Sequence, residues 1–187
     1  PNPRLLLFLP LAHVFARYMQ FFCFAGNVSL GLSSNLKTIL ADFKAFKPTF
    51  ILAVPRIFEK IYNAASQKAG AGFKGRVFAD ATQTAYDWSH AQQSGGSIPL
   101  ALNAKHALYN KLVYSSIMEV FGGHVEYAVS GGAPLDSSIA HFFNGVGLPL
   151  LEGYGMTETC APSSVNPTEG YKIGTIGLPL QGVTMGV

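Results

Sequence analysis

Short apolar runs alternate with amphipathic stretches through the first seventy residues. Residues 4–9 form an apolar run that ends near a proline, and residues 49–54 form another, as expected of strands buried on both faces. Residues 27–32 predict a further strand, and residues 12–25 predict a helix. Strands alternating with helices indicate an α/β fold, with a mostly parallel sheet and helices on both faces.

Two more helices are predicted in this part of the chain. Ser33 or Ser34 is a suitable N-cap for the first, and the apolar residues after it follow an i, i+3, i+4, i+7 spacing, at Leu36, Ile39, Leu40 and Phe43. The second is predicted to begin at Pro55, because the fixed φ and missing N–H of proline cost nothing in a first helical turn.

The middle of the chain has a different pattern. A glycine-rich break at residues 70–75 precedes a polar helical segment that runs to about Gln93, and a Ser-Gly-Gly-Ser link follows at residues 94–97. The next helix is predicted to carry one apolar face, made by Tyr109, Leu112, Val113, Ile117 and Val120. We expect a helical insertion, formed by an antiparallel helix pair lying over the sheet.

Strand–helix alternation then resumes. Residues 125–129 and 148–152 predict strands, and Asp136 is expected to cap a helix between them. Beyond Thr159 the turns predict short antiparallel strands. We therefore expect one domain, in which residues 1–69 and 125–160 form βα units, residues 70–124 the helical insertion, and residues 161–187 the start of a short, irregular β-rich segment.

Composition narrows the class of protein. The chain has 187 residues, enough for one sizeable core, but only 12% are charged and 49% are apolar, against about 25% charged in typical soluble domains. We therefore expect an interior part of a larger protein, with apolar faces through which the isolated chain self-associates. The abrupt ends of the sequence fit the same expectation.

Charge and cysteine usage exclude several functions. A net charge of +3 without a Lys/Arg cluster argues against nucleic acid. Cys23 and Cys160 lie far apart, which favours a reduced, cytoplasmic protein. The longest apolar stretch, residues 5–14, is too short to cross a membrane and carries no signal-peptide pattern, although a protein that handles lipid could still touch a membrane surface. The histidines lack zinc-ligand spacing.

Two glycine-containing segments indicate a nucleotide pocket. In residues 152–159 two glycines flank a tyrosine, and a threonine and a glutamate follow, which suits a phosphate oxygen and a divalent cation bound side by side. Residues 130–134 form a double-glycine turn whose backbone could approach a flat base. Residues 10–13, 55–56, 130–133 and 153–158 each follow a predicted strand, so all four are expected at the carboxyl edge of one sheet, where such folds bind ligands.

These motifs resemble the adenylate-forming enzymes, whose core signature is Tyr-Gly-x-Thr-Glu. Three further stretches are similar to the long-chain fatty-acid–CoA ligase branch of that AMP-binding superfamily: Leu-Pro-Leu-Ala-His-Val-Phe-Ala-Arg at 9–17, Val-Pro-Arg-Ile-Phe-Glu-Lys at 54–60, and Gly-Thr-Ile-Gly-Leu-Pro-Leu-Gln-Gly at 174–182. The five motifs come in the family's order. The resemblance implies the central part of the large N-terminal domain of an acyl-CoA synthetase, which joins a fatty acid to coenzyme A with ATP and Mg²⁺ through an acyl-adenylate.

The resemblance also implies roles for individual residues. Tyr154 would pack against the adenosine, Thr157 would bind the α-phosphate, and Glu158 would be the magnesium ligand. His13 would position or gate the acyl carboxylate and thiol. The expected catalytic residues are thus Thr157, Glu158 and His13, and the expected nucleotide-binding residues are Ser130, Gly131, Gly132, Ala133, Glu152, Gly153, Tyr154, Gly155, Met156 and Thr157.

Other interpretations remain open. The double-glycine turn could be purely structural, Thr157 a turn cap, His13 a core residue, and Arg56 with Glu59 a structural ion pair. An acyl-AMP or aryl-acid ligase would share the same signature, and a non-catalytic nucleotide- or lipid-binding module could have kept the pocket. Because the family's phosphate loop should precede residue 1 and its catalytic lysine should follow residue 187, we expect no complete ligase activity from this chain.

Overall fold

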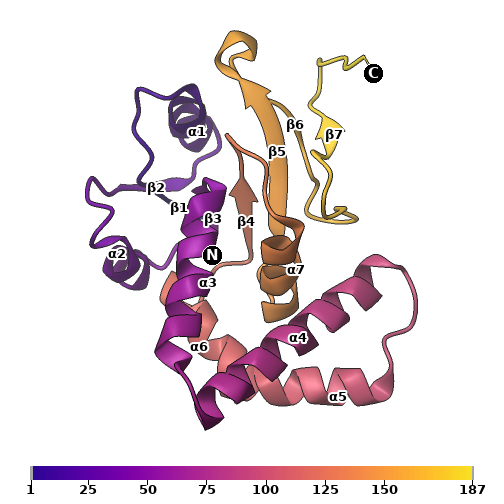
Figure 1. Ribbon diagram of the computed structural model, residues 1–187. Coiled ribbons are helices and arrows are strands. Elements are labelled where there is room, and N and C mark those ends of the chain that lie inside the picture. The colour runs from indigo at the N-terminus through magenta and orange to yellow at the C-terminus, as the bar shows by residue number, and fades with distance from the viewer. Residues whose placement is uncertain (1, 187) are drawn as a thin grey trace.

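The computed structural model describes residues 2–186 and contains one seven-stranded sheet in the order β2-β1-β3-β4-β5-β6-β7. The first five strands are parallel: β1 (Arg4–Leu7), β2 (Ser29–Leu32), β3 (Phe50–Ala53), β4 (Tyr127–Ser130) and β5 (Leu150–Met156). Strands β6 (Ala161–Val165) and β7 (Leu178–Pro179) are antiparallel additions. The predicted α/β fold with a mostly parallel sheet and a short β tail is confirmed (Figure 1).

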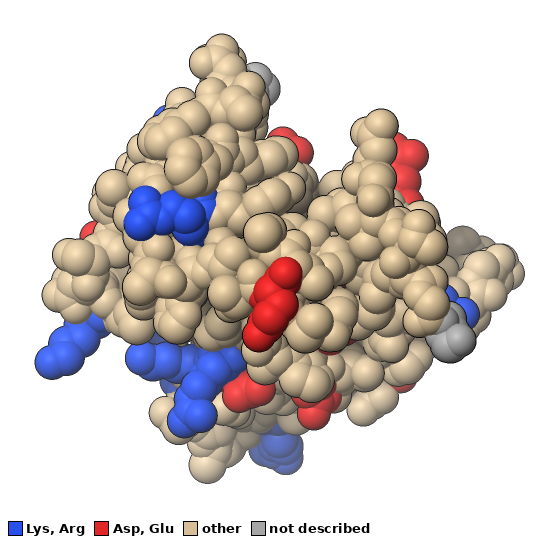
Figure 2. All heavy atoms as spheres, turned by 90° about the horizontal axis from the view of Figure 1, so that it is seen from above, with Lys and Arg blue, Asp and Glu red and all other residues tan. Residues whose placement is uncertain are grey.

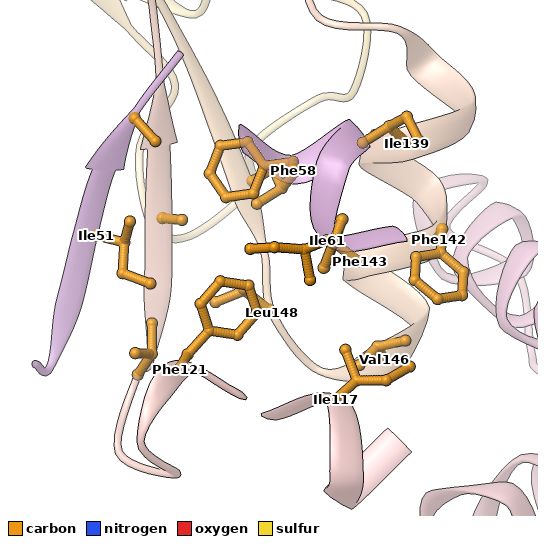
Figure 3. Close-up of a cluster of buried hydrophobic side chains, with 14 of the residues drawn as sticks. Ile51, Phe58, Ile61, Ile117, Phe121, Ile139, Phe142, Phe143, Val146 and Leu148 are labelled. Atoms are coloured by element: carbon orange, nitrogen blue, oxygen red, sulfur yellow. The ribbon is translucent and has the colours of Figure 1, made fainter. Parts of the chain in front are cut away.

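Helices cover both faces of the sheet because the strand residues alternate between two cores. Leu5, Leu7 and Leu52 pack with α1 (Val14–Ala25). The intervening residues, such as Leu6 and Ile51, face a larger core that includes side chains of α2 (Ile39–Phe46), α3 (Pro55–Ala69) and α7 (Ser137–Val146). Figure 3 shows the centre of this larger core, where Phe58, Phe121 and Phe143 lie near Ile51 of the sheet.

The helical insertion forms as predicted but packs elsewhere. Helix α4 (Phe73–Gln93) and helix α5 (Leu100–Tyr109) run antiparallel. Asp80 in the first half of α4 pairs with Lys105 in the second half of α5 at 2.9 Å, and Trp88, later in α4, donates to Asn103, earlier in α5. The pair does not lie on the strands as expected. It reaches the sheet through α7, where Gly145 allows a close crossing: a Cβ there would stand 2.2 Å from the Ala85 carbonyl oxygen.

The apolar face predicted after α5 is confirmed for Tyr109, Val113, Ile117 and Val120, which lie in or against the larger core, and is wrong for Leu112. The helix that carries it is not continuous. A π-helical turn (Asn110–Tyr114) is inserted before α6 (Ser115–Met118) and a 3₁₀ turn (Glu119–Phe121). One extra residue in the turn rotates the face, so Leu112 is 61% exposed while Tyr114 is fully buried. The Tyr114 hydroxyl donates to the Ala81 carbonyl oxygen at 2.7 Å, and burial raises its pKa.

Two local predictions about helix ends have opposite outcomes. Asp136 caps α7 as expected, accepting a hydrogen bond from the Ser138 amide at 2.7 Å. The cap predicted at Ser33 or Ser34 is wrong, because α2 begins only at Ile39. The Ser33 hydroxyl instead donates to the Asp42 carboxylate at 2.6 Å, and the Asn35 side chain holds the Lys37 amide in a turn.

Candidate nucleotide and acyl binding site

A cavity of about 590 Å³ lies between α1 and the sheet, at the carboxyl edge of the parallel strands. Both glycine-containing segments contribute to its wall: Gly131 and Gly132 from the turn after β4, and residues 153–157 from β5 onward. The remaining wall comes from α1, from the strands and from the β tail, through Leu9, His13, Val14, Phe15, Tyr18, Met19, Phe22, Phe50, Leu52, Val54, Tyr127, Val129, Ala161, Pro162, Val165 and Leu180.

The cavity has a polar end and an apolar interior. His13, Tyr154 and Thr157 supply polar groups at the carboxyl edge, and no Asp, Glu, Lys or Arg lines the cavity among the described residues. Figure 2, seen from this edge, likewise shows few charged side chains over the surface. An apolar, uncharged interior suits a hydrocarbon chain better than a polar ligand.

The apolar interior extends down the sheet face toward a pair of aromatic rings. From Val54 to Phe50, four residues back along β3, the distance is about 13 Å at the usual rise of a strand. There Phe50 and Tyr127 stack with ring centroids 5.7 Å apart and planes 15° apart. Burial, followed by the nearby Glu126 charge, raises the pKa of Tyr127, so this ring is neutral at ordinary pH.

The tyrosine motif lies in a strand and not in a turn. Strand β5 continues through Met156, and its second half pairs with β6, with a register irregularity at Tyr154 and Gly155. The two glycines that flank Tyr154 therefore lie in extended strand and make no sharp turn. The glycine at 155 is needed because a Cβ there would stand 2.1 Å from the Ala161 carbonyl oxygen of the neighbouring strand.

A 3₁₀ turn at residues Thr157–Thr159 presents the threonine and the glutamate of the signature. Thr157 and Glu158 are both exposed, and within the described part of the chain neither side chain has a hydrogen-bond partner. The turn itself is held by the Thr159 hydroxyl, which donates to a neighbouring carbonyl oxygen and accepts from the Met156 amide at 3.1 Å. Thr157 and Glu158 are thus free to bind a ligand.

The double-glycine turn follows β4 and faces α1. A Cβ at Gly131 would stand 3.2 Å from the Phe15 ring, and Gly132 has a φ of 82°, which side chains rarely adopt. The backbone conformation thus favours glycine at 132, whereas a side chain at 131 would require the Phe15 ring to shift by a few tenths of an ångström. Ala133 is exposed, whereas the Ser130 hydroxyl is fully buried and has no hydrogen-bond partner among the described residues.

Four of the predicted residues do not line the cavity: Ser130, Ala133, Glu152 and Glu158. Glu152 lies one residue before the cavity wall, and its Oε1 accepts a hydrogen bond from the Leu135 amide at 3.0 Å. His13 does line the cavity, at the N-cap position of α1, where its side chain is exposed and makes no capping hydrogen bond. Arg56 and Glu59 do not form an ion pair among residues 2–186.

Sequence reasoning missed the apolar wall. Phe15, Tyr18 and Phe22 of α1, with Tyr127 and Val129 of β4, line the cavity but were not singled out beforehand. Strand alternation could have found the β4 pair, since Tyr127 and Val129 must share one face once Ala128 is placed in the opposite core.

Neither a metal cluster nor a membrane span is found in the part of the chain that the structure describes. Within the described residues, no group of three or more His, Cys, Asp or Glu side chains could hold an ion. No helix of residues 2–186 combines the length and apolarity needed to cross a bilayer.

A parallel sheet with a cavity at its carboxyl edge, walled by a double-glycine turn and a Tyr-Gly-Met-Thr-Glu segment, defines a nucleotide-binding domain of the adenylate-forming type. The family model described as AMP-binding enzyme matches residues 1–187, and the chain belongs to that family.

Curated relatives point to one branch. The chain is 48% identical over 179 residues to the long-chain-fatty-acid–CoA ligase FadD15 of Mycobacterium bovis, covering 96% of this chain and 30% of that protein. It is 34% identical over 181 residues to long chain acyl-CoA synthetase 3 of Arabidopsis thaliana, covering 95% of this chain and 26% of that protein. The chain therefore spans less than a third of the length of these relatives.

Solved structures share the fold. The o-succinylbenzoate CoA synthetase of Bacillus subtilis, in complex with ATP and magnesium ion, matches with a TM-score of 0.57 and 17% identity, over 96% of this chain and 27% of that one. The A domain of carboxylic acid reductase from Segniliparus rugosus, in complex with AMP and a co-purified carboxylic acid, matches with a TM-score of 0.58 and 23% identity, over 87% and 22%.

Proposed function

We propose that this chain forms the nucleotide and acyl binding region of an ATP-dependent long-chain fatty acid–CoA ligase. The observation that carries the proposal is the single cavity, which joins a polar end lined by Tyr154 and Thr157 to an apolar interior along β3 and β4. An acyl-adenylate has the same two parts, a nucleotide and a hydrocarbon chain, joined at one phosphate. The match to long-chain ligases at 48% identity supports the same substrate class.

In the proposed reaction, the fatty acid carboxylate attacks the α-phosphate of ATP and pyrophosphate leaves. The thiol of coenzyme A then attacks the acyl carbonyl carbon, the thioester forms, and AMP leaves. Negative charge accumulates on the phosphate oxygens during the first step, so hydrogen-bond donors fixed beside them stabilise the transition state.

The residues of this chain bind and orient the reactants. The Thr157 hydroxyl, which has no partner within residues 2–186, donates to an α-phosphate oxygen. Tyr154 packs against the adenosine, while Gly131 and Gly132 allow the base to lie against the backbone of the turn. His13, at the mouth of the apolar interior, positions the acyl carboxylate. Among the remaining predicted residues of the two segments, Gly153, Gly155 and Met156 form part of the nucleotide wall, while Ser130, Ala133 and Glu152 support it from outside the cavity.

The residues present fit a magnesium ion. Glu158 offers an exposed carboxylate without a protein partner among residues 2–186, and Mg²⁺ is usually held by one or two carboxylates together with substrate phosphates and water. When bound, the ion offsets the charge that develops on the phosphates. Glu158 is accordingly the proposed metal ligand, and Thr157 the neighbouring phosphate ligand.

The proposed partners are a fatty acid, ATP and coenzyme A, in a cytoplasmic protein. We also propose self-association of the isolated chain and contact of the enzyme with a membrane surface. Both rest on the outer side of α1, where Phe21 is 61% exposed and Phe24 is 65% exposed, and where Arg17 is the only charged residue of the helix.

The proposal is tested by calorimetric titration of the chain with AMP and with a dodecanoyl sulfamoyl-adenosine, a stable mimic of the acyl-adenylate. We expect both to bind, and the acylated compound to bind at least ten-fold more tightly, since about 0.8 kcal/mol is gained for each buried methylene. Equal affinity for the two compounds, or no binding of either, would contradict the proposal.

The chemistry beyond the adenylate needs a separate test. Addition of coenzyme A to the longer ligase that contains this region should yield a thioester. A reaction that stops at the adenylate would favour an acyl-AMP ligase instead, and the absence of any adenylate would favour a binding module.

A further inference from the structure

Glu152 is the last residue of β5 before the cavity wall, and its side chain is directed to the double-glycine turn. Oε1 of its carboxylate accepts a hydrogen bond from the Leu135 amide at 3.0 Å, across 17 residues of sequence. Leu135 is buried and comes directly after the turn. The bond therefore joins the two segments that wall the nucleotide end of the cavity.

The turn has few other attachments. Gly132, Ala133 and Pro134 are all exposed. Among the hydrogen bonds of the described residues, the one between Leu135 and Glu152 is the only one from residues 132–135 to another element. At the near end of the turn, the Gly131 amide reaches the Ala53 carbonyl oxygen at a long 3.3 Å. The far end of the turn is thus held by the bond to Glu152 together with the Leu135 side chain, which packs in the larger core.

Glu152 is itself held in a rigid position. Its carbonyl oxygen accepts from the Asn166 amide at 2.9 Å, and its backbone pairs in register with Ser130 of β4. Asn166 is 5% exposed and its side chain bonds the Thr175 carbonyl oxygen at 2.6 Å. A hydrogen bond to a carboxylate is stronger than one to a neutral acceptor, so a fixed glutamate is well suited to anchor an exposed turn.

We infer that Glu152 is a positioning residue for the nucleotide: it holds the double-glycine turn at a fixed separation from Tyr154. This rests on the proposed function of the cavity. Glu152 does not line the cavity, so it acts on the nucleotide through the turn and not by touching it. Loss of the bond lets the turn move away from β5, and the base then has to order the turn when it binds.

Variants that change either the length or the charge of the Glu152 side chain distinguish this role from direct contact with the ligand. Glu152→Gln keeps an oxygen at the same reach and removes the charge. Glu152→Asp keeps the charge but withdraws the acceptor by one methylene. If Glu152 anchors the turn, the glutamine variant resembles the unchanged protein and the aspartate variant resembles Glu152→Ala. If its charge acts on the ligand, the order is reversed.

The test compares these three variants with Glu169→Ala, an exposed glutamate outside the site. The first readout is amide hydrogen exchange of Leu135, measured by NMR without nucleotide. We expect exchange at least ten-fold faster in the alanine and aspartate variants, and within about two-fold of the unchanged protein in the glutamine and control variants. Thermal unfolding of each variant checks that the fold is intact, and the glutamine and aspartate variants decide the outcome should the alanine variant not fold.

The second readout is the affinity for AMP. We expect a five- to ten-fold loss in the alanine and aspartate variants, as for the loss of one such hydrogen bond, and less than two-fold in the glutamine and control variants. A glutamine variant as weak as the alanine variant, or unchanged Leu135 exchange in all variants, would overturn the inference. If the unchanged protein binds no AMP, the proposed function fails, and Leu135 exchange alone decides whether Glu152 holds the turn.

Discussion

Gly155 of β5 lies against the backbone of Ala161 in β6, so that a Cβ on Gly155 would stand 2.1 Å from the Ala161 carbonyl oxygen and 2.7 Å from its carbonyl carbon. Ala161 and the preceding Cys160 have φ angles of 96° and 58°, in the left-handed region that residues with a side chain rarely occupy. The 3₁₀ turn with Thr157 and Glu158 therefore lies between a position in β5 that has no room for a side chain and two residues with strained backbone where β6 begins.

The first prediction is that Gly155→Ala destabilises the fold. Because the obstructing atoms are backbone atoms, β6 has to shift, and we expect a loss of about 1–3 kcal/mol in the free energy of unfolding. Chemical denaturation measures it. Gly96→Ala is the matched control, since no atom lies within 4 Å of the added Cβ, and an equal loss in both variants would contradict the close packing of β5 and β6.

The second prediction concerns Thr157. Its hydroxyl has no partner among residues 2–186, so Thr157→Ala should leave the melting temperature unchanged and weaken AMP binding by about ten-fold, the loss of one charge-assisted hydrogen bond. Thr157→Ser should restore most of the affinity. Thr168→Ala, at an exposed position outside the site, is the control. Unaltered affinity in the Thr157→Ala titration would remove Thr157 from the phosphate site.

The third prediction separates the acyl interior from the nucleotide end. Val129 lines the cavity midway along β4, so Val129→Phe should obstruct the hydrocarbon chain. We expect at least ten-fold weaker binding of the dodecanoyl sulfamoyl-adenosine, with AMP binding changed less than two-fold. Val183→Phe, at a position 38% exposed, should change neither. Parallel losses for both ligands would mean that the two parts of the cavity are not separate.

The fourth prediction is a pH dependence of stability. His141 of α7 is buried, its Nδ1 lies 2.9 Å from the Ser89 hydroxyl, and its ring stacks on His90 with centroids 3.7 Å apart. Burial, and then the His90 charge, lower the pKa of His141 below its ordinary value of 6.5. The unfolded chain therefore binds the proton more readily, and stability should fall as pH drops below about 6.5.

Urea denaturation between pH 8 and pH 5 measures this dependence. We expect His141→Gln to be less stable at pH 8, because it alters the hydrogen bonds of Ser89, but to lose less further stability as pH falls. His124→Gln, at an exposed position, should keep the slope of the unchanged protein. An unaltered slope in His141→Gln would exclude His141 as the titrating group.

The fifth prediction is that the isolated chain self-associates. Light scattering should give an average mass that rises with concentration, and replacing both Phe21 and Phe24 of α1 with serine should reduce it. A monomer at all concentrations would show that the exposed phenylalanines do not form a contact between copies.

The overall fold could be predicted because each strand and its following helix carry their own local pattern. Pro55 begins α3 and Asp136 caps α7 as expected, since these signals act within one helical turn. The start of α2 could not be predicted, because the Ser33 hydroxyl donates to the Asp42 carboxylate, and this bond competes with a capping role. The π-helical turn that ends at Tyr114 likewise accompanies a distant contact, the bond of the Tyr114 hydroxyl to Ala81, 33 residues earlier.

The sequence predicted which segments come together at the candidate site, but not the contacts that constrain their residues. The meeting of the Gly131–Gly132 turn with Tyr154 follows from strand order. Gly155, by contrast, owes its place to the neighbouring backbone of β6, which no pattern in β5 reveals. The hydrogen bond between Glu152 and Leu135 also depends on how β5 and the double-glycine turn approach each other. The sequence therefore suggested only that Glu152 lay near the predicted nucleotide pocket.

Strand β5 belongs to two ladders at once, parallel to β4 and antiparallel to β6. A slip of one residue would turn all of its side chains to the opposite face, and here it would have to break both ladders together. The side chains of α1 and β4 that line the cavity can be replaced without changing the backbone pairing of either ladder. Under the proposed function, the residues of the acyl end can therefore diverge while the nucleotide end keeps one geometry.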